Sequence, residues 1–338
     1  MDLKPLEEQV VAVVGASSGI GRETALRFAR RGARVVVAAR DEAGLRSLVE
    51  EICGAGGDAL AVPTDVADYA RVAAAAEHSV ATYGRLDTWV HCAAVALYAM
   101  FADTTPEEFR RVVEVDLLGQ VYGAMAALPH LRREGRGALI HVSSVEAKRA
   151  FPYHSAYGAA KHGVDGFLEA LRVELRHEGL PIAVTQILPA SIDTPLFDQA
   201  RTKLGVKPKG VPPVYRPGLV ADAILAAAEH PRRDLIVGDA GVALALIQRL
   251  SPRLLDALVV RGGFASQRTD EPKAADAPSN LDAPLPGYDR VAGDLGDRAL
   301  GLSATTWLAT RPAGRLGARV GTALGAALLA ARALRQRA

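Results

Sequence analysis

The sequence is poor in the features that mark several protein classes. Its 338 residues include only two cysteines, Cys53 and Cys92. A chain of this length does not need a disulfide to fold, so we expect free thiols in a reducing compartment and no zinc cluster. With 40 basic and 38 acidic side chains the formal charge is only +2. This balance gives no electrostatic reason to expect nucleic acid as a partner, and a small molecule is the better expectation.

Targeting signals and long apolar runs are also absent. Residues 1–8 contain neither a basic leader nor an apolar stretch, so we expect no secretory signal and a cytoplasmic location. The most apolar late stretch, 320–331, has twelve residues, whereas a membrane-spanning helix needs roughly 20. The 32 glycines and 19 prolines show no fixed period, which excludes a collagen-like chain.

Short β-branched runs alternate with segments of helical period through about residue 240. This alternation is typical of an α/β fold built around a parallel sheet. A run such as Val-Val-Ala-Val-Val is apolar on both sides, as a strand covered by helices on each face must be. The pattern predicts strands at 10–14, 34–39, 59–63, 86–91, 138–143, 182–188 and 235–237, and helices at 19–31, 42–52, 69–83, 106–133, 156–178 and 218–230.

The composition changes in the last quarter of the chain. We therefore expect a catalytic dinucleotide-binding domain over residues 1–265 and a C-terminal arm and tail over residues 266–338. Residues 270–297 hold seven acids and two bases, with several Pro and Gly, which indicates a linker or a wrapping arm. The last 28 residues hold six Arg and no acid. This tail is expected to be a marginal helix packed on the body or partly disordered; the alternative is a helix that docks on a membrane surface or a partner.

A glycine-rich turn follows the first predicted strand and opens the first predicted helix. Gly15 permits a tight turn, Gly19 lets the backbone approach phosphates, and Gly21 lets the helix pack on the sheet. The helix N-terminus adds oriented N–H donors and a partial positive charge for a dinucleotide pyrophosphate. An ordinary strand–helix turn is the alternative. The predicted cofactor contacts here are Gly15, Ser17, Ser18, Gly19, Ile20 and Gly21.

The next two predicted strands end where the adenosine half of such a cofactor would lie. The second strand ends without the acid that would bond a free ribose 2′-hydroxyl, and Arg40 follows it. A guanidinium suits a 2′-phosphate, so NADP is favoured over NAD. The alternative is that Arg40 is only a solvated basic residue in a loop. Asp65 and Val66 end the third strand and are expected to contact the adenine; capping of the helix near Asp68 is the rival interpretation.

Three polar residues form an acid–base group in the second half. Tyr157 and Lys161 are four apart on a predicted helix and share a face. An ammonium beside a phenol favours the phenolate, so we expect it to lower a tyrosine pKa that starts near 10. This spacing alone is a weak signal. Ser144, however, ends the fifth predicted strand and is placed to donate to the substrate oxygen that Tyr157 protonates.

These motifs together resemble the short-chain dehydrogenase/reductases, in the branch with one domain of about 250 residues. The resemblance covers residues 7–240. It implies a Rossmann-type, doubly wound parallel sheet of about seven strands and hydride transfer to a carbonyl carbon. It also implies that Tyr157 is the general acid/base, that Ser144 holds the substrate oxygen and that Lys161 grips the nicotinamide ribose. The residues that carry it are Gly15-x-x-x-Gly19-x-Gly21, Ser144, Tyr157-x-x-x-Lys161 and Pro189-Ala-Ser-Ile192-Asp-Thr194, with Pro189, Ile192 and Thr194 near the nicotinamide.

Four positions depart from the family pattern. Val14 replaces a Thr before the first glycine, and Ala190 replaces a Gly. His91-Cys92-Ala93-Ala94 stands in place of Asn-Asn-Ala-Gly, so cofactor contacts at Ala93 must come from backbone. Asp116 stands where the family places an Asn as fourth catalytic member. That Asn acts largely through its main-chain carbonyl, so Asp116 can still serve, although its charge near Lys161 is expected to lower the rate or shift the pH optimum.

The substrate is expected to meet a loop and a set of aromatic side chains. Residues 196–217, with three Lys and four Pro, resemble the family's loop over the substrate mouth, either ordering on binding or permanently ordered. Single aromatic residues in these segments are equally well explained by packing in the core as by contact with a substrate. His154 and His162 flank the Tyr–Lys pair and are expected to be surface or core residues. The aromatics that suggest an apolar substrate are Tyr98, Phe101, Tyr153 and Phe197.

The sequence therefore predicts an NADP(H)-dependent oxidoreductase that interconverts a carbonyl and an alcohol. The alternatives are an epimerase or dehydratase that uses the cofactor transiently, and a non-catalytic cofactor sensor or scaffold on the same fold. A homo-oligomer that pairs through the helices at 106–133 and 156–178 is expected by resemblance only. No metal site is predicted.

Overall fold

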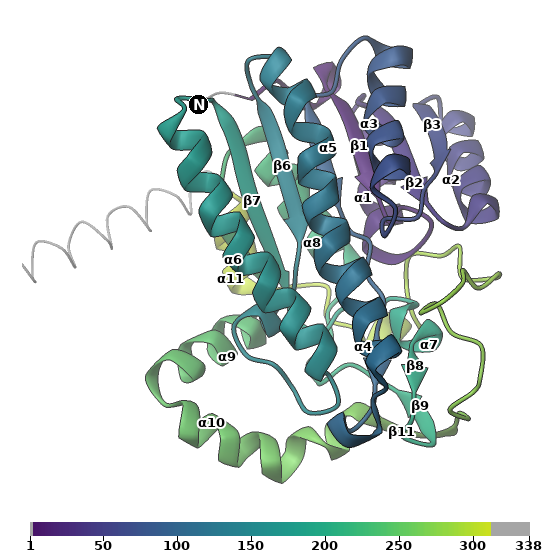
Figure 1. Cartoon of the computed structure of the whole chain (residues 1–338), viewed down its shortest axis with the longest axis vertical. Coiled ribbons are helices and arrows are strands. Elements are labelled where there is room, and N and C mark those ends of the chain that lie inside the picture. The colour runs from purple at the N-terminus through teal and green to yellow at the C-terminus, as the bar shows by residue number, and fades with distance from the viewer. Residues whose placement is uncertain (1–2, 312–338) are drawn as a thin grey trace, which may run out of the picture.

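A seven-stranded parallel sheet forms the centre of the molecule (Figure 1). The structure, a computed structural model, describes residues 3–311. The strand order is β10-β7-β6-β4-β1-β2-β3, which confirms the doubly wound α/β fold. The order reverses between β1 and β4, and such a switch point opens a crevice at the carboxyl ends of the strands. The strands are β1 Val10–Val14, β2 Arg34–Ala39, β3 Asp58–Pro63, β4 Thr88–His91, β6 Gly137–Val142, β7 Ile182–Pro189 and β10 Asp234–Val237.

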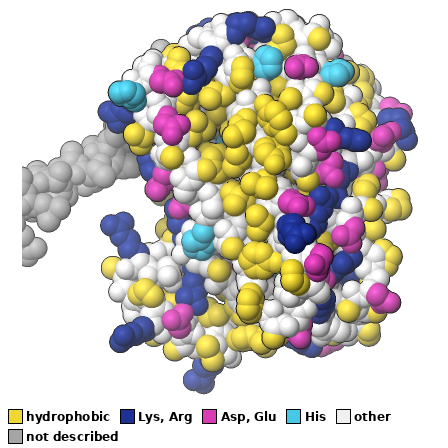
Figure 2. Space-filling model, viewed as in Figure 1, with side chains coloured by type: hydrophobic (Ala, Val, Ile, Leu, Met, Phe, Trp, Pro, Cys, Tyr) yellow, Lys and Arg dark blue, Asp and Glu magenta, His cyan; other side chains and the backbone are white. Residues whose placement is uncertain are grey.

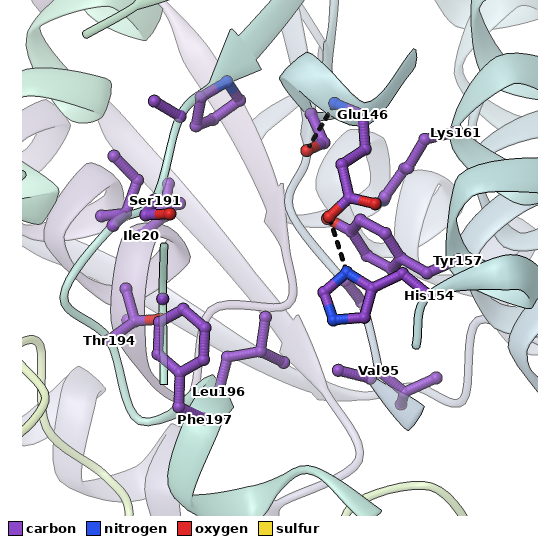
Figure 3. A pocket seen from close by; sticks show the side chains of 18 of the residues that line it. Ile20, Val95, Glu146, His154, Tyr157, Lys161, Ser191, Thr194, Leu196 and Phe197 are labelled. Carbon is purple, nitrogen blue, oxygen red and sulfur yellow. Dashed lines mark hydrogen bonds and ion pairs between the residues drawn. The ribbon is translucent and has the colours of Figure 1, made fainter. Parts of the chain in front are cut away.

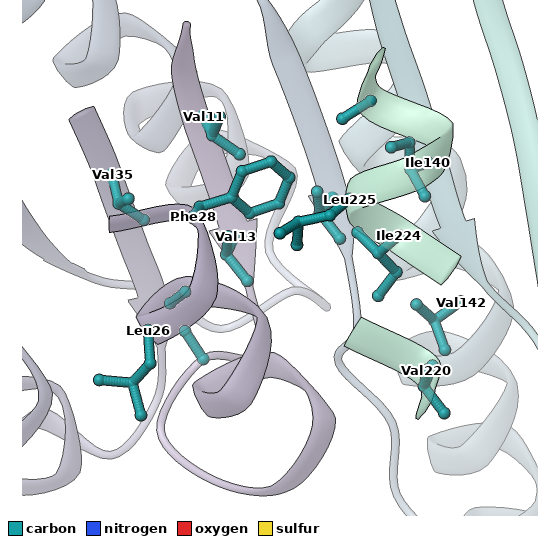
Figure 4. Close-up of a cluster of buried hydrophobic side chains, with 14 of the residues drawn as sticks. Val11, Val13, Leu26, Phe28, Val35, Ile140, Val142, Val220, Ile224 and Leu225 are labelled. Carbon is teal, nitrogen blue, oxygen red and sulfur yellow. The ribbon is translucent and has the colours of Figure 1, made fainter. Parts of the chain in front are cut away.

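Helices cover both faces of this sheet because the side chains of each strand alternate between them. Val11 and Val13 of β1 pack on one face with Phe28, whereas Ala12 and Val14 pack on the other. Figure 4 shows the first cluster, in which Phe28 meets the leucine and isoleucine side chains of α8. One layer comprises α1 Gly19–Arg30, α2 Glu42–Gly54 and α8 Pro217–Glu229; the other comprises α3 Tyr69–Tyr83, α5 Gly119–Arg133 and α6 Ser155–His177.

The helical span predicted over 106–133 is confirmed, but a π-helical turn interrupts the α-helix within it. Helix α4 (Pro106–Val113) begins with a capping box in which Thr105 and Glu108 satisfy each other's backbone N–H groups. A π turn over Glu114–Leu118 follows, and α5 begins at Gly119. Such turns occur frequently at functional sites, and this one contains Asp116.

Two helices that the sequence pattern did not indicate follow β10. They are α9 (Asp239–Leu250) and α10 (Pro252–Leu258), and Figure 1 shows them as an arch at the carboxyl end of the sheet. Several of their leucines face outward, with Leu250 74% exposed. Apolar residues occur on more than one side of these helices, so the sequence lacks the hydrophobic period from which a helix is predicted.

The C-terminal segment lies on the body. Strand β11 (Arg268–Pro272) pairs antiparallel with β9 (Val206–Pro208), and α11 (Ala304–Thr310) packs against α8 and β10. Asp239 accepts a hydrogen bond from the Thr305 N–H at 2.8 Å, which fixes the start of α11. The Arg-rich tail lies outside the described residues. Within residues 3–311 no helix is long and apolar enough to cross a membrane.

Candidate active site

A cavity of about 650 Å³ opens where the strands of the sheet end. Figure 3 shows part of its wall, where Glu146, His154, Tyr157 and Lys161 face Ser191, Thr194 and Phe197 across the open space. Two predicted site residues, Asp65 and Asp116, are not part of this wall. The predicted residues that do line it are Gly15, Ser17, Ser18, Gly19, Ile20, Gly21, Arg40, Val66, Ala93, Ser144, Tyr157, Lys161, Pro189, Ile192 and Thr194.

The glycine turn lies too close to its neighbours for side chains. Gly15 has a φ of +82°, and a Cβ there would lie 2.5 Å from the backbone nitrogen of Ala93. A Cβ on Gly21 would lie 2.1 Å from the Gly15 carbonyl oxygen, so Gly21 allows the helix to pack against the turn rather than against the sheet. The resulting bare backbone at the start of α1 is what a pyrophosphate needs.

The Tyr157 phenol is held in its protonated form. Burial raises its pKa, the nearby Glu146 and Asp116 carboxylates raise it further, and the Ser144 hydroxyl acts in the opposite direction. We expected Lys161 to bring the pKa of Tyr157 into the neutral range. In the protein without a ligand this expectation is wrong, because the pKa is raised. The Lys161 ammonium lies 5.1 Å from the ring centre and is directed instead to a carboxylate. The neutral phenol is the form that can donate a proton.

Asp116 is fully buried behind the cavity wall. Its Oδ1 accepts a hydrogen bond of 2.8 Å from the Val95 N–H, and its Oδ2 lies 3.7 Å from the Lys161 ammonium. Burial raises the pKa of this carboxyl to about 6, although Lys161 opposes the shift. Asp116 thus ties together a wall residue, Val95, and the lysine without reaching the cavity itself.

Glu146 and His154 form a buried pair that sequence reasoning missed. Glu146 Oε1 lies 2.7 Å from His154 Nδ1, and Oε2 accepts from the Phe151 N–H. The His154 ring packs edge-on against both Tyr98 and Tyr157. His154 therefore also lines the cavity, a position for which the sequence provided no expectation beyond a surface or core residue. The sequence signal that could have placed His154 near the cavity is its position three residues before Tyr157.

The end of the cavity expected to hold the adenosine includes Arg40 but not Asp65. The Arg40 guanidinium is partly buried and donates to the carbonyl oxygens of Asn280 and Asp282. The Asp65 carboxylate accepts instead from Ala67 N–H and Arg111. Arg111, distant in sequence, thus holds the Asp65 carboxylate, and the expected contact of Asp65 with adenine stays a prediction.

The substrate end is mostly apolar. Residues of α9 and α10, including Leu244, Ile247 and Leu255, form one wall. Residues 196–217 contribute Phe197 of α7 (Leu196–Gln199) to the wall. The short strands β8 (Arg201–Thr202) and β9, which follow α7, are not part of it. Of the expected aromatics, Tyr98 and Phe197 line the cavity.

The remaining expected pocket residues lie elsewhere. Phe101 is 73% exposed, and Tyr153 packs edge-on against Phe264 at 5.2 Å. Neither is part of the cavity wall. His162 also lies outside it, with Nδ1 2.8 Å from the Gly158 carbonyl oxygen in its own helix.

Comparison with known proteins identifies the family. Residues 9–205, more than half of the chain, match the family model described as short chain dehydrogenase. The chain belongs to the short-chain dehydrogenase family. It is 41% identical over 274 residues to the uncharacterized oxidoreductase YxnA of Bacillus subtilis, covering 80% of this chain and 77% of that protein. It is 33% identical over 256 residues to dehydrogenase/reductase SDR family member 7B of Bos taurus, covering 72% and 78%.

Solved short-chain dehydrogenase structures share the fold. A short-chain dehydrogenase/reductase from Burkholderia phymatum in complex with NAD superposes with a TM-score of 0.68 at 22% identity, covering 75% of this chain and 97% of that one. A single-residue variant of the actinorhodin polyketide ketoreductase with NADPH gives 0.60 at 29% identity, covering 69% and 96%. By its family this chain is an oxidoreductase, and the two solved neighbours hold NAD and NADPH respectively.

Proposed function

We propose that this short-chain dehydrogenase uses NADP(H) to interconvert an apolar ketone or aldehyde and its alcohol. The observation that carries the proposal is the convergence of Ser144, Tyr157 and Lys161 on the cavity that the glycine turn opens. The fit to a dinucleotide rests on that turn, where a Cβ at Gly15 or Gly21 would collide with backbone. When bound, the nicotinamide supplies or accepts the hydride.

Each side chain of the site has a defined task in reduction. The neutral Tyr157 phenol donates its proton to the carbonyl oxygen as negative charge develops there. Ser144 O–H donates to the same oxygen and orients it. Lys161 would hold the cofactor by donating to its ribose hydroxyls, and Asp116 positions both Lys161 and the Val95 backbone. In oxidation the Tyr157 phenolate is the base, which requires a higher pH because its pKa is raised.

Turnover of a carbonyl library tests the activity. Wild-type protein is expected to consume NADPH with apolar ketones or aldehydes, and Tyr157→Phe is expected to slow that consumption by about 10²–10⁴. Tyr69→Phe is the matched control, because Tyr69 is 47% exposed and lies outside the cavity wall. Equal rates for wild type and Tyr157→Phe would refute the mechanism.

The preference for NADP rests on Arg40. Its guanidinium lies in the cavity wall directly after β2, where it can meet a 2′-phosphate. The next residue, Asp41, also lines the cavity and is the N-cap of α2, where its Oδ1 accepts from the Gly44 N–H at 3.1 Å. Arg40→Asp should weaken NADPH binding more than NADH binding; equal wild-type affinities for the two would remove the preference.

A homo-oligomer is supported by the surface of the α5–α6 face. Figure 2 shows hydrophobic side chains gathered over these helices. Met125 of α5 and Val173 of α6 are 55% and 66% exposed. Apolar patches of this kind mark interfaces in soluble proteins, so Val173→Glu should reduce the mass measured by light scattering. The free thiols Cys53 and Cys92 support a cytoplasmic location.

A further inference from the structure

Residues 279–290, here called the arm, cross the adenosine end of the cavity. The Asn280 N–H donates to the Gln199 carbonyl oxygen at 2.9 Å. In return, Arg40 donates to the Asn280 carbonyl at 2.6 Å, and Arg111 donates to the Leu281 carbonyl at 3.0 Å. The arm is thus bonded to the two arginines at that end.

The far end of the arm is bonded to the glycine turn. The Gly19 N–H, in the first turn of α1, donates to the Arg290 carbonyl oxygen at 2.9 Å. The Arg290 side chain pairs with Asp198 at 3.0 Å and Asp294 at 2.8 Å. In Figure 1 the segment appears as yellow-green loops beside α7 and β8. The arm is therefore pinned at both ends to elements that build the cofactor site.

The cavity continues beneath the arm. Its wall combines Gly19 and Arg40 with Asn280, Leu285 and Tyr288 of the arm. Between the anchors, Leu281 is 1% exposed and belongs to the same core cluster as Val66. The arm consequently forms part of the wall of the cavity that the glycine turn opens.

Asn280 has an unused side chain at this end of the cavity. The residue is 7% exposed, and its Oδ1 has no hydrogen-bond partner among residues 3–311. A buried polar atom without a partner costs free energy, so such groups usually mark a ligand or water position. A carboxamide is the side chain that pairs in bidentate fashion with the edge of adenine, accepting from N6–H and donating to N7.

We propose that the arm completes the cofactor site, with the Asn280 carboxamide bonding the adenine and with Leu285 and Tyr288 covering the bound dinucleotide. The proposal rests on the proposed function, because it requires a dinucleotide in the cavity. The arm selects for the adenine end of the cofactor and slows its release. It acts on NAD and NADP alike, because the adenine is common to both.

The test compares three cofactor probes on full-length protein. NADPH and NADH carry the adenine, whereas reduced nicotinamide mononucleotide does not. Asn280→Ala should raise the dissociation constant of NADPH and of NADH about five- to tenfold, the loss expected for one or two hydrogen bonds. Binding of the mononucleotide should stay unchanged. Nicotinamide fluorescence gives all three constants.

Release kinetics test the covering role. The double variant Leu285→Ala with Tyr288→Ala should increase the dissociation rate of NADPH about tenfold in stopped flow. Asp289→Ala is the matched control, because Asp289 lies in the same arm, is exposed and is not part of the cavity wall. Each variant is first checked for the wild-type thermal unfolding midpoint.

The outcomes separate this proposal from the proposed function. If the wild type binds NADPH and Asn280→Ala binds it equally well, the proposed role of the arm is overturned and the enzyme assignment stays intact. Tighter or faster NADPH binding in the double variant would show that the arm blocks the site, which also overturns the proposal. Wild-type protein that binds neither NADPH nor NADH would refute both.

Discussion

Replacing Asp116 by asparagine should shift the proton affinity of Tyr157. Above its own pKa of about 6 the Asp116 carboxyl is ionised, and its charge raises the pKa of the phenol. An amide carries no charge at any pH, yet its oxygen can still accept the Val95 N–H that Oδ1 accepts now. The substitution therefore removes the charge and preserves the shape, so the Tyr157 pKa should fall.

The distances set the size of this shift. Asp116 Oδ2 lies 3.7 Å from the Lys161 nitrogen, which lies 5.1 Å from the Tyr157 ring centre. The carboxylate oxygen is thus within about 9 Å of the ring centre, and unit charges at that distance with an effective dielectric constant of about 20 interact by about 2 kcal/mol. That interaction corresponds to a pKa decrease of about 1.4 units. Release of Lys161 from its carboxylate acts in the same direction.

Tyrosinate absorbance measures the effect without a substrate. The titration curve of Asp116→Asn minus that of Asp116→Asn with Tyr157→Phe gives the titration of Tyr157 in the variant. The curve of the wild type minus that of Tyr157→Phe gives the reference. Once a substrate is known, the pH midpoint of alcohol oxidation should move to lower pH by the same amount, because oxidation needs the phenolate.

The exposed Asp103 is the control for a general charge effect. Asp103→Asn should leave the titration of Tyr157 unchanged, since this side chain lies on the surface and its charge is screened by solvent. A Tyr157 pKa that stays constant or rises in Asp116→Asn would refute the reasoning and would show that the carboxylate is protonated or compensated at neutral pH.

Three further substitutions test the site and the core. Tyr157→Phe should lower kcat for carbonyl reduction by about 10²–10⁴, with NADPH affinity retained by fluorescence titration. Gly21→Ala should weaken NADPH binding more than tenfold, because its Cβ would lie 2.1 Å from the Gly15 oxygen; Gly54→Ala, with nothing within 4 Å, is the control. Phe28→Ala, at a fully buried position, should lower the free energy of unfolding by about 3–5 kcal/mol in urea.

Local pattern was sufficient for the sheet and the main motifs. The apolar run of β1 and the glycine turn that follows it are adjacent in sequence, so their structure depends on nearby residues and could be predicted. Tyr157 and Lys161 lie one helical turn apart, and that spacing fixed their shared face. All seven predicted strands are present, and the largest boundary error is at β4, which begins at Thr88.

Long-range contacts decided the rest. Whether residues 270–297 form a linker or wrap the body depends on bonds to Arg40, Arg111 and Gly19, more than 150 residues earlier. The pKa of Tyr157 follows from burial and from Glu146 and Asp116, which only the folded chain brings around it. The sequence determines which neighbouring groups can interact. The burial of a side chain and the contacts of a segment that is distant in sequence depend on the tertiary structure.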